Sequence, residues 1–207
     1  VDLKGFDEAV YLKLNGGALR PVLDALLTLR RAGVWVEIVN LVVPTYTDRM
    51  DAIGRMCDWI AEALGPDVPL HFSRCHPAHK LRLAPTPADT LEAARARARE
   101  AGLRYVYIGN VPGLKDAATT FCPRCAKAVV VRDVYSLAAI HLEGSACRFC
   151  GATRTLVPHT TRPPSLPRAA RGGSGTPLAT AATGAPTAAA SGASAAYFTA
   201  SAWSRRP

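Results

Sequence analysis

Residues 34–43 read VWVEIVNLVV, and this run of β-branched and apolar residues, which Pro44 ends, decides the fold class. So continuous a run suits a strand buried on both faces of a parallel sheet better than a half-exposed strand. Residues 70–74 and 103–111 have the same character. The sequence therefore predicts a buried parallel sheet in an α/β fold.

Helices are predicted between these strands, because apolar residues recur there every three or four positions. Pro21 falls in a first helical turn, where proline is tolerated, and Asp48 is expected to cap a helix. Glycines are expected to end three of the helices. The four predicted helices cover residues 6–14, 21–32, 48–64 and 87–102.

Residues 1–4 resemble the end of another strand, which predicts a chain that is incomplete on its N-terminal side. Strands and helices then alternate, which is the signature of right-handed parallel βα units. The sequence thus predicts a partial barrel or an open doubly wound sheet.

Residues 158–207 differ from the rest in composition, since Ala, Ser, Thr, Pro and Gly dominate and no Asp or Glu occurs. Such a segment has too little bulky apolar surface to offset the entropy of ordering it, so it is predicted to be disordered. It also holds five of the nine net positive charges. The basic character of the chain therefore does not indicate nucleic-acid binding, and no specific nucleic-acid partner is expected.

The cysteine content predicts a reducing compartment, with the cytoplasm as the default. Six cysteines occur without a recognisable secretory signal, and no apolar run is long enough to span a bilayer, so no membrane partner is expected. Cys57 falls within a predicted helix and is expected to be a small core residue.

Two CxxC pairs form the most specific motif of the chain: Cys122 with Cys125, and Cys147 with Cys150. The 21 residues between the pairs are typical of a zinc ribbon, in which each pair gives two thiolates to one tetrahedral ion. Small residues follow each pair, where the backbone must turn tightly. Four thiolates leave no position for water, so the zinc is expected to be structural. An iron-sulfur cluster and a dithiol redox pair are the alternatives.

Polar residues mark the predicted strand ends, where ligands of parallel sheets bind. Glu37 lies within a predicted buried strand, so it needs a partner, for which Lys4 or Arg74 is expected. The expected cleft residues are Asp2, Lys4, Glu37, Asn40, Ser73, Arg74, His76 and Asn110.

Several blocks of the chain, taken in order, resemble one known family. They include residues 2–5 (DLKG), residues 72–77 (FSRCHP), residues 102–110 (GLRYVYIGN) and the paired CxxC. Together they resemble the radical SAM enzyme of the AmmeMemoRadiSam system, which is similar to pyruvate formate-lyase activating enzymes. The resemblance runs from residue 1 to about residue 158.

The resemblance implies a partial (βα)6 barrel, in which a [4Fe-4S] cluster and S-adenosylmethionine generate a 5′-deoxyadenosyl radical. It places S-adenosylmethionine against Asp2, Lys4 and His76, with Glu37 and Arg74 in the same cleft, where Lys4 would pair with the methionyl carboxylate. The substrate is left open by the resemblance, with a protein as one candidate.

The chain departs from this family at the cluster, because the CxxxCxxC motif that holds it has no counterpart among the six cysteines. The resemblance therefore implies the C-terminal half of a barrel over residues 1–114, without its N-terminal strands and inactive alone. A zinc-ribbon-like element over 115–157 and the tail over 158–207 follow. The alternative is a non-catalytic zinc-ribbon binding module, whose basic rim would be Lys127, Arg132, Arg148 and Arg154.

Overall fold

The computed structural model describes residues 1–78, 82–133 and 136–153. The chain divides into two compact units, Val1–Pro163 and Pro164–Pro207, and every described residue belongs to the first. The predicted tail and Arg154 lie outside the described residues. Within the described part, no helix has the length and apolar character needed to cross a membrane.

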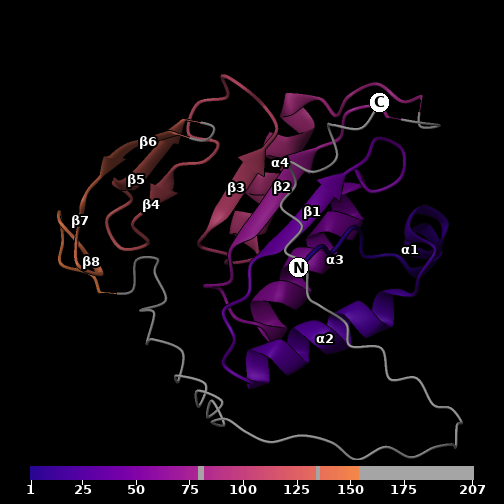
Figure 1. Ribbon diagram of the computed structural model, residues 1–207, viewed down its shortest axis with the longest axis horizontal. Helices are drawn as coiled ribbons and strands as arrows, with labels where there is room; N and C mark the ends of the chain where they lie inside the picture. The colour runs from indigo at the N-terminus through magenta and orange to yellow at the C-terminus, as the bar shows by residue number, and fades with distance from the viewer. Residues whose placement is uncertain (79–81, 134–135, 154–207) are drawn as a thin grey trace, which may run out of the picture. The chain divides into compact units, whose positions relative to one another are not determined.

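Three parallel strands form the central sheet, in the order β1-β2-β3 (Figure 1). They span Ile38–Val42, Leu70–Arg74 and Val106–Gly109. Asp2 extends the sheet beyond β1 through a parallel bridge to Val39. The α/β class and the parallel pairing of successive strands are thus confirmed.

Four helices contribute to one hydrophobic core with this sheet: α1 (Glu8–Asn15), α2 (Leu19–Arg31), α3 (Met50–Ala63) and α4 (Ala88–Glu100). The core takes alternate strand residues, such as Ile38 and Phe72, which are fully buried. The residues between them, such as Val39 and His71, lie on the other face and are only half-buried. The four helices thus share their core with the buried side of the sheet.

Two local predictions were wrong. Strand β1 begins at Ile38 rather than at Val34, and Val34 and Trp35 are 49% and 45% exposed. The prediction that this strand is buried on both faces was also wrong, because β1 alternates between buried and half-buried residues. Asp48 does not cap α3: the helix begins at Met50, and no side chain caps its first turn.

The remaining strands are short and antiparallel. A three-stranded sheet joins β4 (Thr120–Phe121), β5 (Ala128–Asp133) and β6 (Ser136–Ile140), and a hairpin joins β7 (Leu142–Glu143) to β8 (Ala146–Cys147). Gly144, with φ +60°, lies in the hairpin turn. These five strands hold the two CxxC pairs.

Candidate metal centre and the polar face of the sheet

The four paired cysteines converge on one point. Sγ of Cys122 lies 3.6 Å from Sγ of Cys150, and Sγ of Cys125 lies 3.8 Å from Sγ of Cys147. All four sulfurs lie within 4.8 Å of one another. A tetrahedral zinc with Zn–S bonds of about 2.3 Å holds its sulfurs about 3.8 Å apart, so the donor set fits a single ion. The four cysteines are free rather than joined in disulfides.

The two knuckles have the same backbone turn. Ala126 donates its N–H to the carbonyl of Cys122, and Gly151 donates to the carbonyl of Cys147, at 2.9 and 2.8 Å. Both residues have left-handed backbone, with φ +55° and +69°. The prediction that small residues turn the chain after each pair is therefore confirmed.

The thiols of the metal-free site differ in acidity. Burial raises the pKa of Cys122, but backbone N–H groups of Cys125 and Arg124 and the neighbouring thiols lower it to about 6. The Ala152 N–H lowers the pKa of Cys150, but burial and the three other thiols outweigh it and raise the pKa to about 12. Cys122 is thus mainly a thiolate at neutral pH, and a bound cation would be needed to deprotonate Cys150.

The sheet face turned away from the helices carries polar side chains. In parallel strands, register partners point to the same side, and every second residue follows them. The register aligns Val39 with His71 and His71 with Tyr107. Asp2, opposite Val39, belongs to the same row, and Lys4 lies one row toward the carboxyl ends. We call this surface the polar face; its members are Asp2, Lys4, Glu37, His71, Ser73 and Tyr107.

Asp2 and Lys4 are brought together as a pair, with 3.1 Å between Nζ and Oδ1, and both side chains remain partly exposed. Asp2 aligns with Val39, the second residue of β1, and Lys4 lies two positions further toward the carboxyl edge of the sheet. This edge is where ligands of parallel sheets bind.

Glu37 does not pair with Lys4 or Arg74, and that expectation was wrong. Its carboxylate accepts a hydrogen bond from Nε1 of Trp35 at 3.1 Å and lies 3.0 Å from Nε2 of His71. The bond to His71 lowers the pKa of Glu37 although burial opposes it. Glu37 precedes β1, so it lies at the amino edge of the sheet, about 13 Å along the strands from the carboxyl edge.

Arg74 and His76 follow β2 at the carboxyl edge but contact other groups than Asp2 and Lys4. Nε of Arg74 donates to the carbonyl of Thr86 at 2.9 Å, and Nε2 of His76 lies 3.4 Å from the carbonyl of Asn110. His76 is exposed. Arg74, the last residue of β2, lies on the core side of the strand alternation, and His76 lies beyond the end of the strand.

Two contributors to the site were missed in the sequence, His71 and Tyr107. Their rings stack with centroids 4.9 Å apart, and the Tyr107 hydroxyl lies 2.9 Å from Oγ1 of Thr120, two residues before Cys122. Arg132 donates to the same Thr120 oxygen at 3.2 Å. His71 and Tyr107 lie two positions before Ser73 and Gly109, respectively, so they point to the same face of the sheet. Both rings could have been assigned to this face if the strand register had been known. The polar face is thus linked to the first knuckle.

No family model matches this chain. An uncharacterized protein of Methanocaldococcus jannaschii is 42% identical to it over 154 residues, which are 73% of this chain and 46% of that protein. The chain spans about half the length of this curated relative. A domain of pyruvate-formate lyase-activating enzyme from Bacteroides vulgatus superposes with a TM-score of 0.46 at 15% identity, over 53% of this chain and 65% of that one. A superposition at this score does not establish a common fold.

Proposed function

We propose that this chain is part of a radical SAM enzyme similar to the activating enzymes, and that it supplies the S-adenosylmethionine cleft and a structural zinc site. The observation that carries the proposal is the Asp2–Lys4 pair on the polar face, with Lys4 on the side of the carboxyl edge. Lys4 would bind the methionyl carboxylate and Asp2 the ammonium group, since each would exchange its partner for the matching charge of the ligand. His76, exposed at the same edge, would lie against the adenosyl group.

The described cysteines do not fit the catalytic [4Fe-4S] cluster. Cys57 and Cys75 are buried separately, in the core and after β2, and burial raises the pKa of both thiols. The other four are grouped around a point that suits one ion, whereas a cluster sets each thiolate on its own iron. In this proposal the cluster ligands come from another part of the enzyme, and this chain alone does not cleave S-adenosylmethionine.

Binding of S-adenosylmethionine to the zinc-loaded chain tests the proposal. Isothermal titration calorimetry should show one site, and Lys4→Met should weaken it about tenfold or more, because a charge-assisted bond to the carboxylate is lost. Lys115→Met, which removes an exposed lysine elsewhere, should leave the affinity unchanged. Equal affinity in the chain and in Lys4→Met would rule out the assigned cleft.

Elemental analysis of the anaerobically purified chain tests the metal assignment. Zinc near one equivalent, lost in Cys122→Ala, is expected, because the sulfur spacing suits a single ion. Iron with visible absorbance would instead mean that these cysteines carry an iron-sulfur cluster.

A second candidate, a ribbon that binds a partner through its surface, rests on Phe149. This ring is 44% exposed, Nζ of Lys127 lies 4.8 Å from its centroid, and the His141 ring packs against it at 5.4 Å. Exposed aromatic rings next to cations suit single-stranded nucleic acid. A salt-dependent affinity for single-stranded RNA that Phe149→Ser abolishes would favour this function, and the absence of such affinity would remove it.

A further inference from the structure

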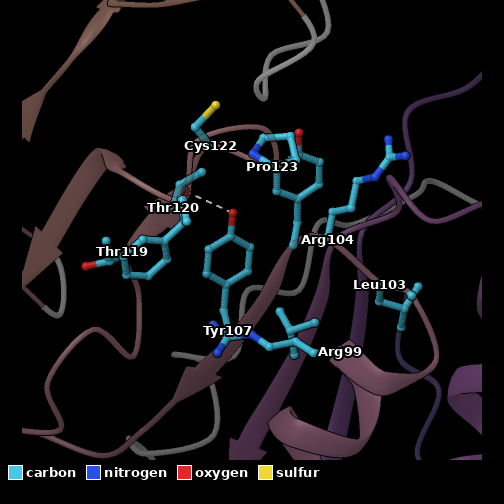
Figure 2. A pocket seen from close by; sticks show the side chains of 13 residues that line it. Arg99, Leu103, Arg104, Tyr107, Thr119, Thr120, Cys122 and Pro123 are labelled. Atoms are coloured by element: carbon cyan, nitrogen blue, oxygen red, sulfur yellow. Dashed lines mark hydrogen bonds between the residues drawn. The ribbon is translucent and has the colours of Figure 1, made fainter. Parts of the chain in front are cut away.

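An open cavity of ≈ 470 Å³ lies between the end of α4, the start of β3 and the first knuckle, and Figure 2 shows its lining. The volume is in the range of small-molecule sites. It opens at the amino end of β3, whereas the proposed S-adenosylmethionine cleft lies at the carboxyl edge. The cavity is therefore a separate site.

The lining of the cavity is electropositive. Arg99 and Arg104 are among its residues, and none of the lining residues is acidic. Arg104 is paired with Asp67 at 2.9 Å. The Arg99 side chain, by contrast, makes no hydrogen bond or ion pair with any residue in the described ranges 1–78, 82–133 and 136–153.

The neighbours of Arg99 on α4 compensate its charge only in part, because Arg95 repels it and Glu92 attracts it. Arg95 takes the adjacent carboxylate, since its Nη2 pairs with Glu92 and its Nη1 donates to the carbonyl of Asp116. Burial lowers the pKa of Arg99, and the positive charge of Arg95 lowers it further. An anion at the mouth of this cavity would relieve that repulsion.

The rest of the lining suits the organic part of a ligand. Leu103, Val106 and Pro123 contribute apolar lining, and Thr119 and Thr120 contribute hydroxyl-bearing residues. Guanidinium groups bind phosphate oxygens in a bidentate manner better than any other side chain. A bare phosphate would leave most of the volume empty.

We propose that this cavity binds a small organic phosphate of about nucleotide size, with Arg99 as the principal phosphate ligand. The site does not depend on the proposed function, and its ligand would contact the first knuckle through Cys122 and Pro123. The ligand would therefore favour the metal-loaded form of the knuckle.

Titration of the zinc-loaded chain with AMP, adenosine and inorganic phosphate, followed by amide chemical shifts, tests the site. AMP should shift amides of residues 102–107 and 119–126, and it should bind at least about tenfold more tightly than adenosine. Arg99→Gln should weaken AMP about fivefold or more, while Arg31→Gln, an exposed arginine at the end of α2, should not. Asp67→Asn should tighten AMP, because it frees Arg104.

Equal affinity for AMP and adenosine, or AMP binding that Arg99→Gln leaves intact, would overturn the proposal. Shifts confined to the carboxyl edge of the sheet would do the same, because they would place AMP in the other cleft. Lys4→Met keeps the two proposals apart, since it should lower affinity for S-adenosylmethionine and leave AMP unaffected.

Discussion

Ala126 and Gly151 occupy equivalent positions in the two knuckles, yet only one of them is glycine. Both have positive φ, a conformation that costs a residue with a Cβ about 1 kcal/mol or more. The first knuckle therefore stores backbone strain that the second knuckle does not.

Replacing this alanine should stabilise the protein. Ala126→Gly is expected to raise the free energy of unfolding of the metal-loaded chain by about 0.5–1 kcal/mol, the strain relieved less the added chain entropy. Urea denaturation measures it. Gly151→Ala is the opposite substitution and should destabilise the protein by a similar amount. The effect would come from backbone strain alone, because no non-neighbouring atom of the described residues lies within 4 Å of the added Cβ. A loss of stability in Ala126→Gly would show that the turn is not strained.

Glu37 should make stability depend on acid pH. The hydrogen bond with His71 lowers its pKa in the folded chain, although burial opposes this. The ionised Glu37 therefore stabilises the folded chain at pH values above about 4.3, which is the pKa of glutamate in an unfolded chain. This stabilisation is lost as the pH falls through the lower pKa that Glu37 has in the folded chain. Below about pH 5, the stability of the unmodified chain should fall more steeply with decreasing pH than that of the Glu37→Gln variant. Thermal melts over this pH range would show the difference.

The matched control for this carboxylate is Glu62→Gln, on the exposed side of α3. The stability of Glu62→Gln should fall with decreasing pH as steeply as that of the unmodified chain. Parallel slopes in all three proteins would mean that Glu37 and His71 are not coupled.

At the scale of elements, the apolar pattern predicted the strands and helices that pack in the core. The predicted strand 70–74 is β2, and the helix predicted over 21–32 is α2 with small differences at its ends. The pattern failed at Val34 and Trp35, which are as apolar as core residues but remain exposed. Apolar character shows what burial would favour, but only packing shows whether a residue has something to pack against.

The crossing of α3 and α4 depends on a residue that the sequence did not single out. A Cβ at Gly54 would lie 2.7 Å from Nε of Arg97, whose Nη2 pairs with Asp58 at 2.7 Å. The glycine thus makes room for the arginine that ties the two helices together.

Gly54→Ala tests this arrangement by a double-mutant cycle. In the unmodified chain the gain in helix propensity, about 1 kcal/mol, should be cancelled or reversed by displacement of Arg97. In an Arg97→Ala background the same substitution should stabilise by about 1 kcal/mol, as chemical denaturation would show. Equal effects in both backgrounds would mean that the guanidinium moves aside freely.

At the scale of the molecule, two cores of different nature share one compact unit. The large core consists of apolar side chains from the central sheet and the four helices. It contains Cys57 but none of the paired cysteines. The small one is built from Cys122, Val129 and Cys147. Sequence spacing alone identified the four cysteines, whereas the polar face depended on strand register, which no local pattern contains.

Removal of the metal should therefore unfold only part of the chain. Chelation is expected to abolish hydrogen-exchange protection in β5, β7 and β8, because their core depends on the ion, while amides of β1, β2 and β3 stay protected. Exchange followed by mass spectrometry on peptic fragments would measure this. Loss of protection in all strands together would show that the two cores are one cooperative unit.

The position of the cysteines along the chain also affects synthesis. Strands β1, β2 and β3 pair with their neighbours in sequence and are complete at Gly109, before the first knuckle begins. The proposed metal site, by contrast, needs Cys122 and Cys150, which are 28 positions apart. On a translating ribosome the sheet can form while the second knuckle is still within the exit tunnel. A cell short of the metal would therefore accumulate chains with a folded sheet and exposed thiols, which are targets for oxidation and for quality-control proteases.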